Sequence, residues 1–591
     1  MSRPRMVYLA FALAVLGVAV SAAPALAKKD GFTTSRPAML APGDIPGVSI
    51  TPLLTVGDTL SGGYRFESVP DGISLKRKDH NRFEAFVNHE TGKSPFPWVP
   101  NGLNDETNAE NDFDNSQLSR LTFNGDAEVL SGSLAITSPL GYQRFCSNYL
   151  ATWRESFNRP VLFTNEESPD YFARQENSWP ALPIGGSDEQ EAGFVVALEP
   201  KSGKQRTIPG MGRHNHENSV PIPGYGHPVV LSGDDTFTSG PLSPVGTTPS
   251  QPAQSQLYSY IADSANDVLK DRGELWAFVS DNPAIDDYYD VLPGSGTQVS
   301  GHFIKVPRDI ATGLNPDGSD TQAQDHGYPE PPSDGTWQPE PRYQGPPPVP
   351  GVDGPQWVLN HWSDVNNVFQ FVRVEDIAYD KRPGMGNVVY IADSGRGRRP
   401  DQSQDTPNFR STNGRVWKMV LDEDDPTKVT SLSVFVEGDD NVVKTPTEIH
   451  QPDNLESTGN GILVTEDPGS SQQFPAGGGG DVRATTARLW HVPLAGEAGK
   501  AVAARVDQSQ DGPAGGDVDG RAPGNWGAWE STGVVDASRF FGAGAFLINI
   551  QAHTLWIQKR LGEDNFPPAG RADFMYKREG GQLLLIRIPG G

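Results

Sequence analysis

Short strands separated by turn residues recur along this chain, and this pattern constrains its fold more than any other feature. The runs are rich in apolar, β-branched and aromatic residues, and the chain holds 65 glycines and 52 prolines. Turn-flanked runs of this kind predict an all-β fold. The clearest predicted strands cover residues 83–90, 121–130, 160–167, 193–204, 274–282, 387–395, 414–421, 461–467, 488–494, 546–553 and 582–588.

Helical patterning is scarce, and one segment stands out. Residues 256–269 follow a loop rich in Pro, Ser and Gln and carry a helical periodicity. We therefore predict one helix there and few, short helices elsewhere.

Two segments resemble copies of one unit, in which a strand leads into a glycine turn. They read GFVVALEPKSGK (193–204) and RLWHVPLAGEAGK (488–500). Such a repeat favours a β-propeller over a sandwich. Six or seven blades of about 40–45 residues would use about 250–300 residues, so the chain holds either two propellers or one with long insertions. We favour one propeller over residues 28–591, with insertions at about 312–355, 396–413, 468–486 and 507–527.

The first 27 residues have the pattern of a secretory signal peptide. Arg3 and Arg5 precede an apolar run over residues 6–20, and Ala25-Leu26-Ala27 forms an A-x-A cleavage site. We expect a secreted or periplasmic protein, cut before Lys28. No later stretch is apolar over the ~18 residues that a membrane-spanning helix needs.

The net charge of the chain limits the kinds of partner that it can bind. The formal net charge is −26, which argues against a nucleic-acid partner. It fits a protein that binds cations, although solubility alone would also explain it. Cys146 is the single cysteine, so an intramolecular disulfide is impossible. We expect a monomer that acts on a small molecule.

Polar residues cluster where the predicted strands end. In a propeller the innermost strands lie side by side around the axis, so corresponding ends would bring these residues together. Buried carboxylates repel one another, and Ca²⁺ relieves the repulsion by binding six to eight oxygen atoms. Turn formation is the alternative for any one Asp or Asn, but Glu is a poor turn residue. The clusters are Asn88-His89-Glu90, Asn165-Glu166-Glu167, Arg213 to Glu217, Asp234-Asp235, Arg373 with Glu375-Asp376, His450 with Asp453-Asn454, Glu466-Asp467, and Asn549 with Gln551 and His553.

Taken in order, these motifs resemble the PhoX-type alkaline phosphatases. The resemblance rests on VNHE (87–90), Cys146 before Thr152-Trp153, NEE (165–167), GR-x-x-HE (212–217), GDD (233–235), VED (374–376), PDNL (452–455), TED (465–467) and NIQ-x-H (549–553). It implies a six-bladed β-propeller whose axial cluster of Ca²⁺ and Fe³⁺ hydrolyses phosphate monoesters. It also implies that Cys146 is a thiolate ligand of iron.

Further ligands follow from the same resemblance. The carboxylate ligands that it implies first are Glu90, Glu167, Glu217, Asp235, Glu375 and Asp376. Asn88, His216, Asp453, Glu466, Asp467 and Gln551 would be ligands or would hold the ligands in place.

Three residues within or beside these motifs are candidates for catalysis. Arg213 and Arg373 could hold the phosphate through paired hydrogen bonds, or could pair with neighbouring carboxylates. His553, like His89 and His214, could protonate the leaving group or brace a ligand. Two other functions remain open: a non-catalytic calcium-binding propeller that presents loops to a partner, and a lactonase-like metal hydrolase.

Overall fold

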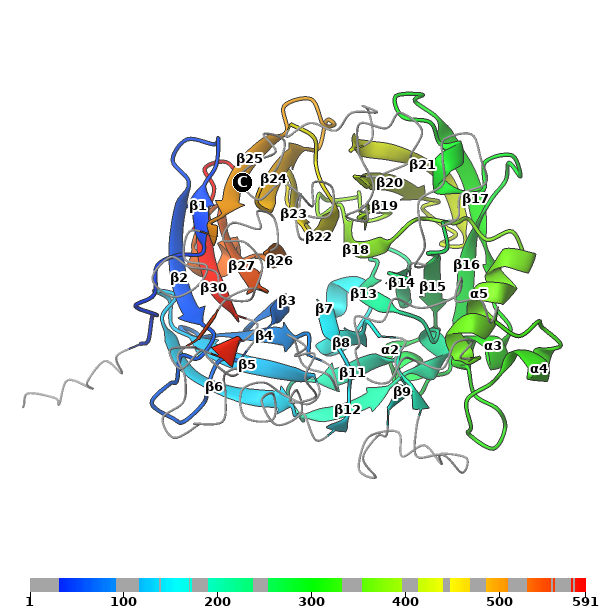
Figure 1. The fold of residues 1–591 in the computed structure, drawn as a ribbon, viewed down its shortest axis with the longest axis horizontal. Coiled ribbons are helices and arrows are strands. Elements are labelled where there is room, and N and C mark those ends of the chain that lie inside the picture. The colour runs from blue at the N-terminus through cyan, green and yellow to red at the C-terminus, as the bar shows by residue number, and fades with distance from the viewer. Residues whose placement is uncertain are drawn as a thin grey trace, which may run out of the picture.

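The computed structural model describes fifteen stretches of the chain. They are residues 31–67, 69–91, 116–137, 140–168, 171–172, 190–236, 253–331, 353–395, 413–438, 447–467, 485–508, 529–553, 556–557, 576–577 and 580–591. Within them the chain is built of antiparallel sheets arranged in a ring, as in a β-propeller (Figure 1). This confirms the all-β propeller prediction. The predicted signal peptide lies outside the described residues.

Six strands form the inner wall of the ring. Each contacts the next one around the axis, and the last contacts the first, so that the wall is closed. The six strands are β3 (Pro70–Arg77), β7 (Phe145–Ala151), β13 (His216–Pro221), β18 (Val374–Tyr379), β22 (Pro452–Ser457) and β26 (Glu530–Asp536).

Each inner strand begins a sheet that extends outward through antiparallel neighbours. From β3 the order is β4 (Phe83–His89), β5 (Gln117–Phe123) and β6 (Val129–Ile136). From β7 it is β8 (Val161–Glu166), β11 (Val195–Glu199) and β12 (Lys204–Thr207). From β22 it is β23 (Gly461–Glu466), β24 (Arg488–Pro493), β25 (Ala501–Val506) and β1 (Leu40–Pro42).

The sheet of β26 closes the ring with both ends of the described chain. Its order is β26, β27 (Ala545–Ala552), β30 (Gly580–Arg587) and β2 (Ser49–Thr55). The early strand β2 pairs with the late strand β30 from Ser49 opposite Arg587 to Thr55 opposite Gln582. This pairing places an early and a late strand of the chain in one sheet (Figure 1).

The remaining two inner strands share one nine-stranded sheet. From β13 it continues through β14 (Val229–Asp234), β15 (Leu257–Ile261), β16 (Glu274–Ser280) and β17 (Gln298–Lys305). From β18 it continues through β19 (Val388–Asp393), β20 (Arg415–Leu421) and β21 (Lys428–Glu437). The outer strands β17 and β21 pair with each other. We interpret this sheet as two blades joined at their outer edges, which would give six blades around the axis.

Short helices and ladders complete the described fold. The helices are α2 (Ala265–Val268), α3 (Arg308–Thr312), α4 (Ala323–His326), α5 (Pro355–Val365) and α6 (Ser538–Phe541). Two small ladders are β9 (Tyr171–Phe172) with β10 (Gln190–Glu191), and β28 (Trp556–Ile557) with β29 (Tyr576–Lys577). No helix within the described stretches is both long enough and apolar enough to cross a membrane.

Two local predictions were wrong. The predicted helix at 256–269 is strand β15 followed by the single turn α2, because its aromatic and β-branched residues pair in the sheet. The predicted strand at 121–130 is the end of β5, a hairpin turn and the start of β6, since Asn124 Oδ1 accepts from the backbone N–H groups of Asp126 and Glu128 within the turn. The helix α5, which lies just after the first predicted insertion, was missed. The other three predicted insertions fall largely outside the described residues.

Candidate metal centre and active site

A shift of register occurs at the start of five inner strands. In each of these inner strands, the second and third residues stand outside the regular pairing with the next strand of the sheet, which we call the second strand. Such bulges re-aim side chains and are common beside active sites. The displaced pairs are Asp71-Gly72 in β3, Cys146-Ser147 in β7, Glu217-Asn218 in β13, Glu375-Asp376 in β18 and Asp453-Asn454 in β22.

The second strand next to an inner strand contributes polar residues just after its C-terminal end. Because the two strands are antiparallel, the end of the second strand lies beside the start of the inner strand. Glu90 follows β4 in this way, Glu167 follows β8, Asp235 follows β14 and Asp467 follows β23. The repeated polar strand ends therefore have two origins, which corrects our expectation that all of them belong to inner strands.

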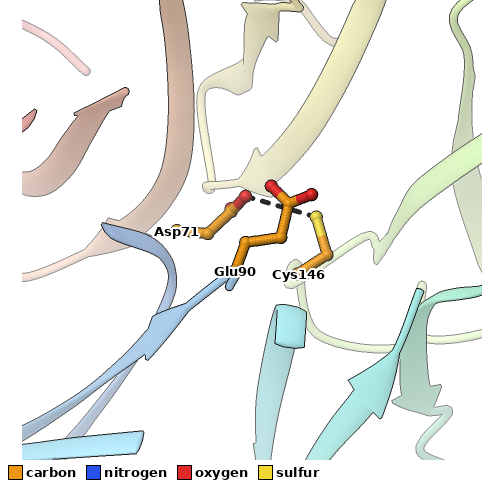
Figure 2. A group of neighbouring side chains, drawn as sticks. All are labelled: Asp71, Glu90 and Cys146. Atoms are coloured by element: carbon orange, nitrogen blue, oxygen red, sulfur yellow. Dashed lines mark hydrogen bonds between the residues drawn. The ribbon is translucent and has the colours of Figure 1, made fainter. Parts of the chain in front are cut away.

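The side chains from these positions converge on the axis in three linked groups. The ligand atoms of each group lie within 4.8 Å of one another. The groups are Asp71, Glu90 and Cys146; Cys146, Glu167 and Glu217; and Glu217, Glu375 and Asp453. Cys146 and Glu217 are each shared by two groups, so the three form one chain of potential ligands. Figure 2 shows Asp71, Glu90 and Cys146 pointing toward one another.

Hydrogen bonds hold this chain of ligands in shape. The Cys146 thiol donates to Asp71 Oδ2 at 3.2 Å. Gln551 Nε2 donates to the same Asp71 oxygen at 2.7 Å and to Glu90 Oε2 at 3.0 Å. One amide therefore fixes the carboxylates of two strands.

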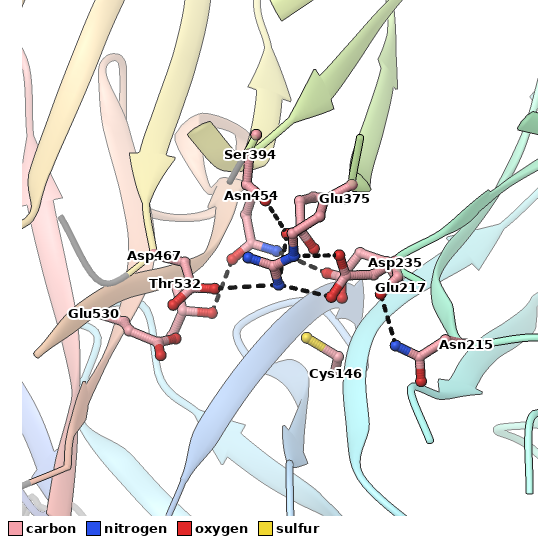
Figure 3. A network of polar contacts seen from close by, with 12 residues as sticks. Cys146, Asn215, Glu217, Asp235, Glu375, Ser394, Asn454, Asp467, Glu530 and Thr532 are labelled. Atoms are coloured by element: carbon pink, nitrogen blue, oxygen red, sulfur yellow. Dashed lines mark hydrogen bonds and ion pairs between the residues drawn. The ribbon is translucent and has the colours of Figure 1, made fainter. Parts of the chain in front are cut away.

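A second set of bonds fixes Glu217. Ser147 Oγ donates to Glu217 Oε1 at 2.8 Å, and Asn454 Nδ2 donates to Ser147 Oγ at 2.8 Å. Asn454 Oδ1 accepts in turn from Thr532 Oγ1 at 2.8 Å and from the backbone N–H of Gly533. The start of β26 is thus tied to Ser147 of β7 and, through it, to Glu217 of β13. Figure 3 shows Thr532 beside Asn454.

Burial without compensating charge is the main electrostatic feature of these residues. Desolvation by burial raises the pKa of Asp71, Glu217 and Asp453 well above the usual range, and the neighbouring carboxylates raise it further. Burial and the charges of Asp71 and Glu217 also raise the pKa of the Cys146 thiol. The arrangement therefore favours protons or cations at the axis.

Arg373 supplies positive charge beside the third group. Its Nε and Nη2 donate to the two carboxylate oxygens of Asp235, each at 2.7 Å. Its Nη2 also lies 3.0 Å from Glu375 Oε1. Burial still raises the pKa of Glu375, in opposition to the charge of Arg373. Figure 3 shows the carboxylates of Asp235, Glu217 and Glu375 gathered in this region.

The residues at the axis fit a cluster of cations. Glu217 Oε2, Gln551 Oε1 and Asn549 Oδ1 are buried and have no hydrogen-bond partner among the described residues. Oxygen atoms of carboxylates and amides are the ligands that Ca²⁺ takes, and a thiolate suits a transition metal such as iron. A cation would also deprotonate the thiol and the carboxyl groups that bind it.

Six of the residues predicted as metal ligands meet in the three groups: Glu90, Cys146, Glu167, Glu217, Glu375 and Asp453. The structure places three other predicted ligands, Asp235, Asp376 and Glu466, differently. Both carboxylate oxygens of Asp235 bind Arg373. Asp376 accepts from the backbone N–H groups of Ile377 and Leu455. Glu466 accepts from Arg488, Trp490 and the backbone of His450.

The three predicted catalytic residues have different surroundings. Arg373 lies against the third group of ligands, as described above. Arg213 donates to the backbone oxygen of Glu191, lies 3.3 Å from Asp320 and stacks over Phe194, so its contacts anchor loops rather than ligands. His553 Nε2 lies 2.7 Å from Glu530 Oε1 at the start of β26.

The histidines near the other motifs brace the fold. His89 binds Ser119 at 2.7 Å, and His216 binds Ser232 at 2.8 Å and the backbone oxygen of Gly212 at 3.1 Å. His214 stacks against Tyr258. Burial lowers the pKa of both His214 and His216, in the latter to about 3, so both rings are neutral.

Asp71 was missed by reading the sequence. Its Pro-Asp-Gly context is typical of a turn, and the segment that follows it did not stand out as a strand. The signal that could have found it is its position. Asp71 is the second residue of a strand whose partner leads into VNHE, just as Glu217 is the second residue of a strand whose partner leads into GDD.

Comparison with known protein families identifies the chain. The model of the family described as alkaline phosphatase PhoX matches residues 163–521, more than half of the 591 residues. The chain therefore belongs to this family, which confirms the resemblance seen in the motifs. No curated protein matches the chain significantly.

Proposed function

We propose that this member of the PhoX alkaline phosphatase family hydrolyses phosphate monoesters at the axis of the propeller, with Ca²⁺ and Fe³⁺ as its cations. The observation that carries the proposal is the linked chain of ligands from Asp71 to Asp453. Membership of the family supports phosphatase activity. The identity of the cations rests on the chemistry of the donor atoms.

The ligands divide by donor type. Cys146, with Glu167 and Glu217 around it, would hold the iron, because a thiolate is a soft ligand. The oxygen-only group of Glu217, Glu375 and Asp453 would hold Ca²⁺. Bound cations supply positive charge to the phosphoryl oxygens and make water a better nucleophile.

Arg373 orients and attracts the substrate in this proposal. Its guanidinium is buried and fixed by Asp235 and Glu375, so it places a permanent positive charge at a set position. Phosphoryl transfer depends mainly on such positioning and charge neutralisation. Asp235 acts on the substrate only through Arg373.

We assign the proton of the leaving group to the pair of His553 and Glu530. Hydrolysis breaks the ester P–O bond, and the departing alkoxide oxygen needs a proton. His553 is partly exposed and is held by Glu530 at 2.7 Å. We propose that it delivers this proton, and that Glu530 keeps the imidazole oriented.

Export through the N-terminal segment is part of the same proposal. Residues 6–20 and the A-x-A site at 25–27 have the pattern of a cleaved signal peptide. N-terminal sequencing of the protein recovered outside the cytoplasm should begin at Lys28. Recovery of the uncleaved chain in the cytoplasm alone would contradict export.

Assay of the full chain with p-nitrophenyl phosphate tests the activity. The protein is loaded with Ca²⁺ and Fe³⁺ and assayed at alkaline pH, before and after removal of the cations by a chelator. We expect hydrolysis that the chelator abolishes and that added cations restore. A fully loaded protein that does not hydrolyse phosphate monoesters would refute the proposal. Hydrolysis of a lactone panel instead would assign the site to the lactonase-like alternative.

A further inference from the structure

A pocket opens at the end of the propeller opposite the ligands. Cys146 and Glu375 lie at the starts of β7 and β18, whereas Trp153 and Tyr379 lie beyond or at the ends of the same two strands. At about 3.3 Å per residue, the ends of β7 and β18 lie roughly 13–17 Å from the ligands along the strands. The pocket has a volume of about 470 Å³, within the usual range for small-molecule sites.

Trp153 stands at the rim of this pocket with 79% of its surface exposed. A tryptophan side chain carries a large apolar area, and leaving it in water is costly. An exposed indole beside a hollow offers a flat apolar face on which the ring of a ligand can stack. Among the described residues, the other exposed large apolar side chains are Leu134, Leu292 and Val365, none of which lines this pocket.

The turn that carries Trp153 is held firmly. Glu155 Oε2 accepts from the backbone N–H of Thr152 at 2.8 Å and from its hydroxyl at 2.9 Å. Glu155 Oε1 accepts from Tyr379 OH at 2.7 Å. The exposed ring is therefore presented by a fixed turn that is bonded to the inner strand β18, and a ligand would bind without the cost of ordering this turn.

Groups that can hydrogen-bond surround the ring. Arg382 is fixed by Asp380, with Nη2 and Oδ2 2.6 Å apart, and remains partly exposed. Asn387 is held by its amide nitrogen, which donates to the backbone oxygen of Leu421 at 2.8 Å. Both side chains line the pocket together with Tyr225. Planar groups at fixed positions beside a flat aromatic ring can bind the hydroxyls of a sugar stacked on that ring.

The charge of the pocket indicates an uncharged ligand. Its lining carries three cationic side chains, Arg154, Lys381 and Arg382, and two anionic ones, Asp380 and Glu423. Lys381 is further paired with Glu456. The nearly balanced lining offers little attraction to an anion, and the net charge of −26 over the chain repels polyanions.

We propose that this pocket is a binding site for neutral saccharides, in which the indole of Trp153 stacks on the apolar face of a pyranose ring. The site is separate from the phosphatase centre and anchors the protein to a neutral glycan. Its occupant does not reach the axial ligands, so binding leaves phosphate ester hydrolysis unchanged.

Titration of the full-length, metal-loaded protein with maltotetraose, cellotetraose and chitotetraose tests the proposal. Binding is followed by calorimetry and by tryptophan fluorescence. We expect at least one of the three to bind, Trp153→Ala to weaken that binding by ~10-fold or more, and Trp153→Tyr to recover part of it, because the lost contact is an aromatic stack. Leu292→Ala, at an exposed site outside the pocket, should bind as the wild type does.

Three results would overturn the proposal. One is the absence of binding to all three saccharides at about 10 mM, a concentration at which even weak sites fill. Another is binding that survives Trp153→Ala. The third is Trp153-dependent binding of a proline-rich or acidic peptide in place of the saccharides. Hydrolysis of p-nitrophenyl phosphate by Trp153→Ala is measured in parallel, so that failure of the phosphatase proposal and failure of this one are read separately.

Discussion

The thiol of Cys146 donates a hydrogen bond to Asp71 Oδ2 at 3.2 Å, although the two residues are 75 positions apart in the chain. Both lie in the bulge at the start of an inner strand, in adjacent strands of the closed wall. Each group competes for a proton or a cation, because burial raises the pKa of both. This contact joins the predicted thiolate ligand to a carboxylate that was not predicted.

Replacing the thiol should remove the iron site specifically. In Cys146→Ser the hydroxyl stays protonated near neutral pH and is a poor ligand for iron, so we expect loss of any thiolate-to-iron absorption band. We also expect phosphatase activity to fall by ~100-fold or more, typical of the loss of a group needed in the transition state. Visible spectroscopy and p-nitrophenyl phosphate assays check this. A variant that keeps both the band and the activity would contradict the assignment of Cys146.

Removing the negative charge of Asp71 should stabilise the cation-free protein and weaken its binding of cations. Asp71→Asn relieves repulsion among buried carboxylates, so the cation-free protein should melt at a higher temperature at pH 8 than the wild type. The same change should weaken cation binding by ~10-fold or more, since one charged ligand is lost. Asp44→Asn, at a side chain that is 64% exposed, is the matched control. Unaltered cation affinity in Asp71→Asn would show that Asp71 is no ligand.

The cation-free protein should lose stability as the pH rises from 7 to 9. Burial raises the pKa of Asp376 to about 7 and of Asp234 to about 8, and raises those of Asp71, Glu217 and Asp453 well above the usual range. Over this interval the folded state binds protons that the unfolded state, with carboxyl pKa values near 4, has already released, so the free energy of unfolding falls.

Calorimetry at several pH values checks this dependence. We expect the melting temperature of the cation-free protein to drop by about 2 °C or more between pH 7 and 9, and that of the loaded protein to change less, because cations replace the protons. Burial lowers the pKa of His214 and His216, so these two rings bind no protons in the folded state over this interval. A cation-free protein that becomes more stable as the pH rises would contradict the electrostatic account.

Arg373 should matter to stability as well as to catalysis. Arg373→Met leaves Asp235 and Glu375 buried without their partner, and loss of one member of a buried ion pair costs about 3–5 kcal/mol. Chemical denaturation measures this loss. Arg505→Met is the control, because Arg505 pairs with Asp44 at the surface and such a pair contributes about 0–1 kcal/mol. Equal losses in the two variants would mean that the Arg373 pair is not structurally important.

Glu466 offers a contrast within the predicted ligand set. Its carboxylate oxygens accept from Arg488 and Trp490, so its charge is already compensated by protein groups. We expect Glu466→Gln to lower the stability but to keep the full number of bound cations, as measured by elemental analysis. Loss of a cation in this variant, with the fold intact by circular dichroism, would make Glu466 a ligand after all.

Reading the sequence identified the type of fold and most of the converging residues, for a definite physical reason. Most strands pair with the next strand in the chain, so the strands and the polar ends of the second strands are visible in short windows. The bulges are not, because they depend on how two strands pair. This is why Asp71 resembled a turn residue, and why the hydrogen bonds of Asp376 and Glu466 to other protein groups could not be seen in the sequence. A carboxylate can point toward the axis, pair with an arginine or accept from a backbone N–H. Contacts between distant segments decide which of these it does, as the contact between Glu466 and Arg488 shows.

The most direct test of the axial cluster is the cation content of the purified protein and of Glu217→Gln, because Glu217 is shared by two of the three groups. Elemental analysis is combined with the p-nitrophenyl phosphate assay on the same samples. We predict at least two cations per wild-type chain, with iron among them, and a loss of both cations and activity in Glu217→Gln. Full activity in a chain that holds fewer than one cation, or an unchanged cation content in the variant, would contradict the account.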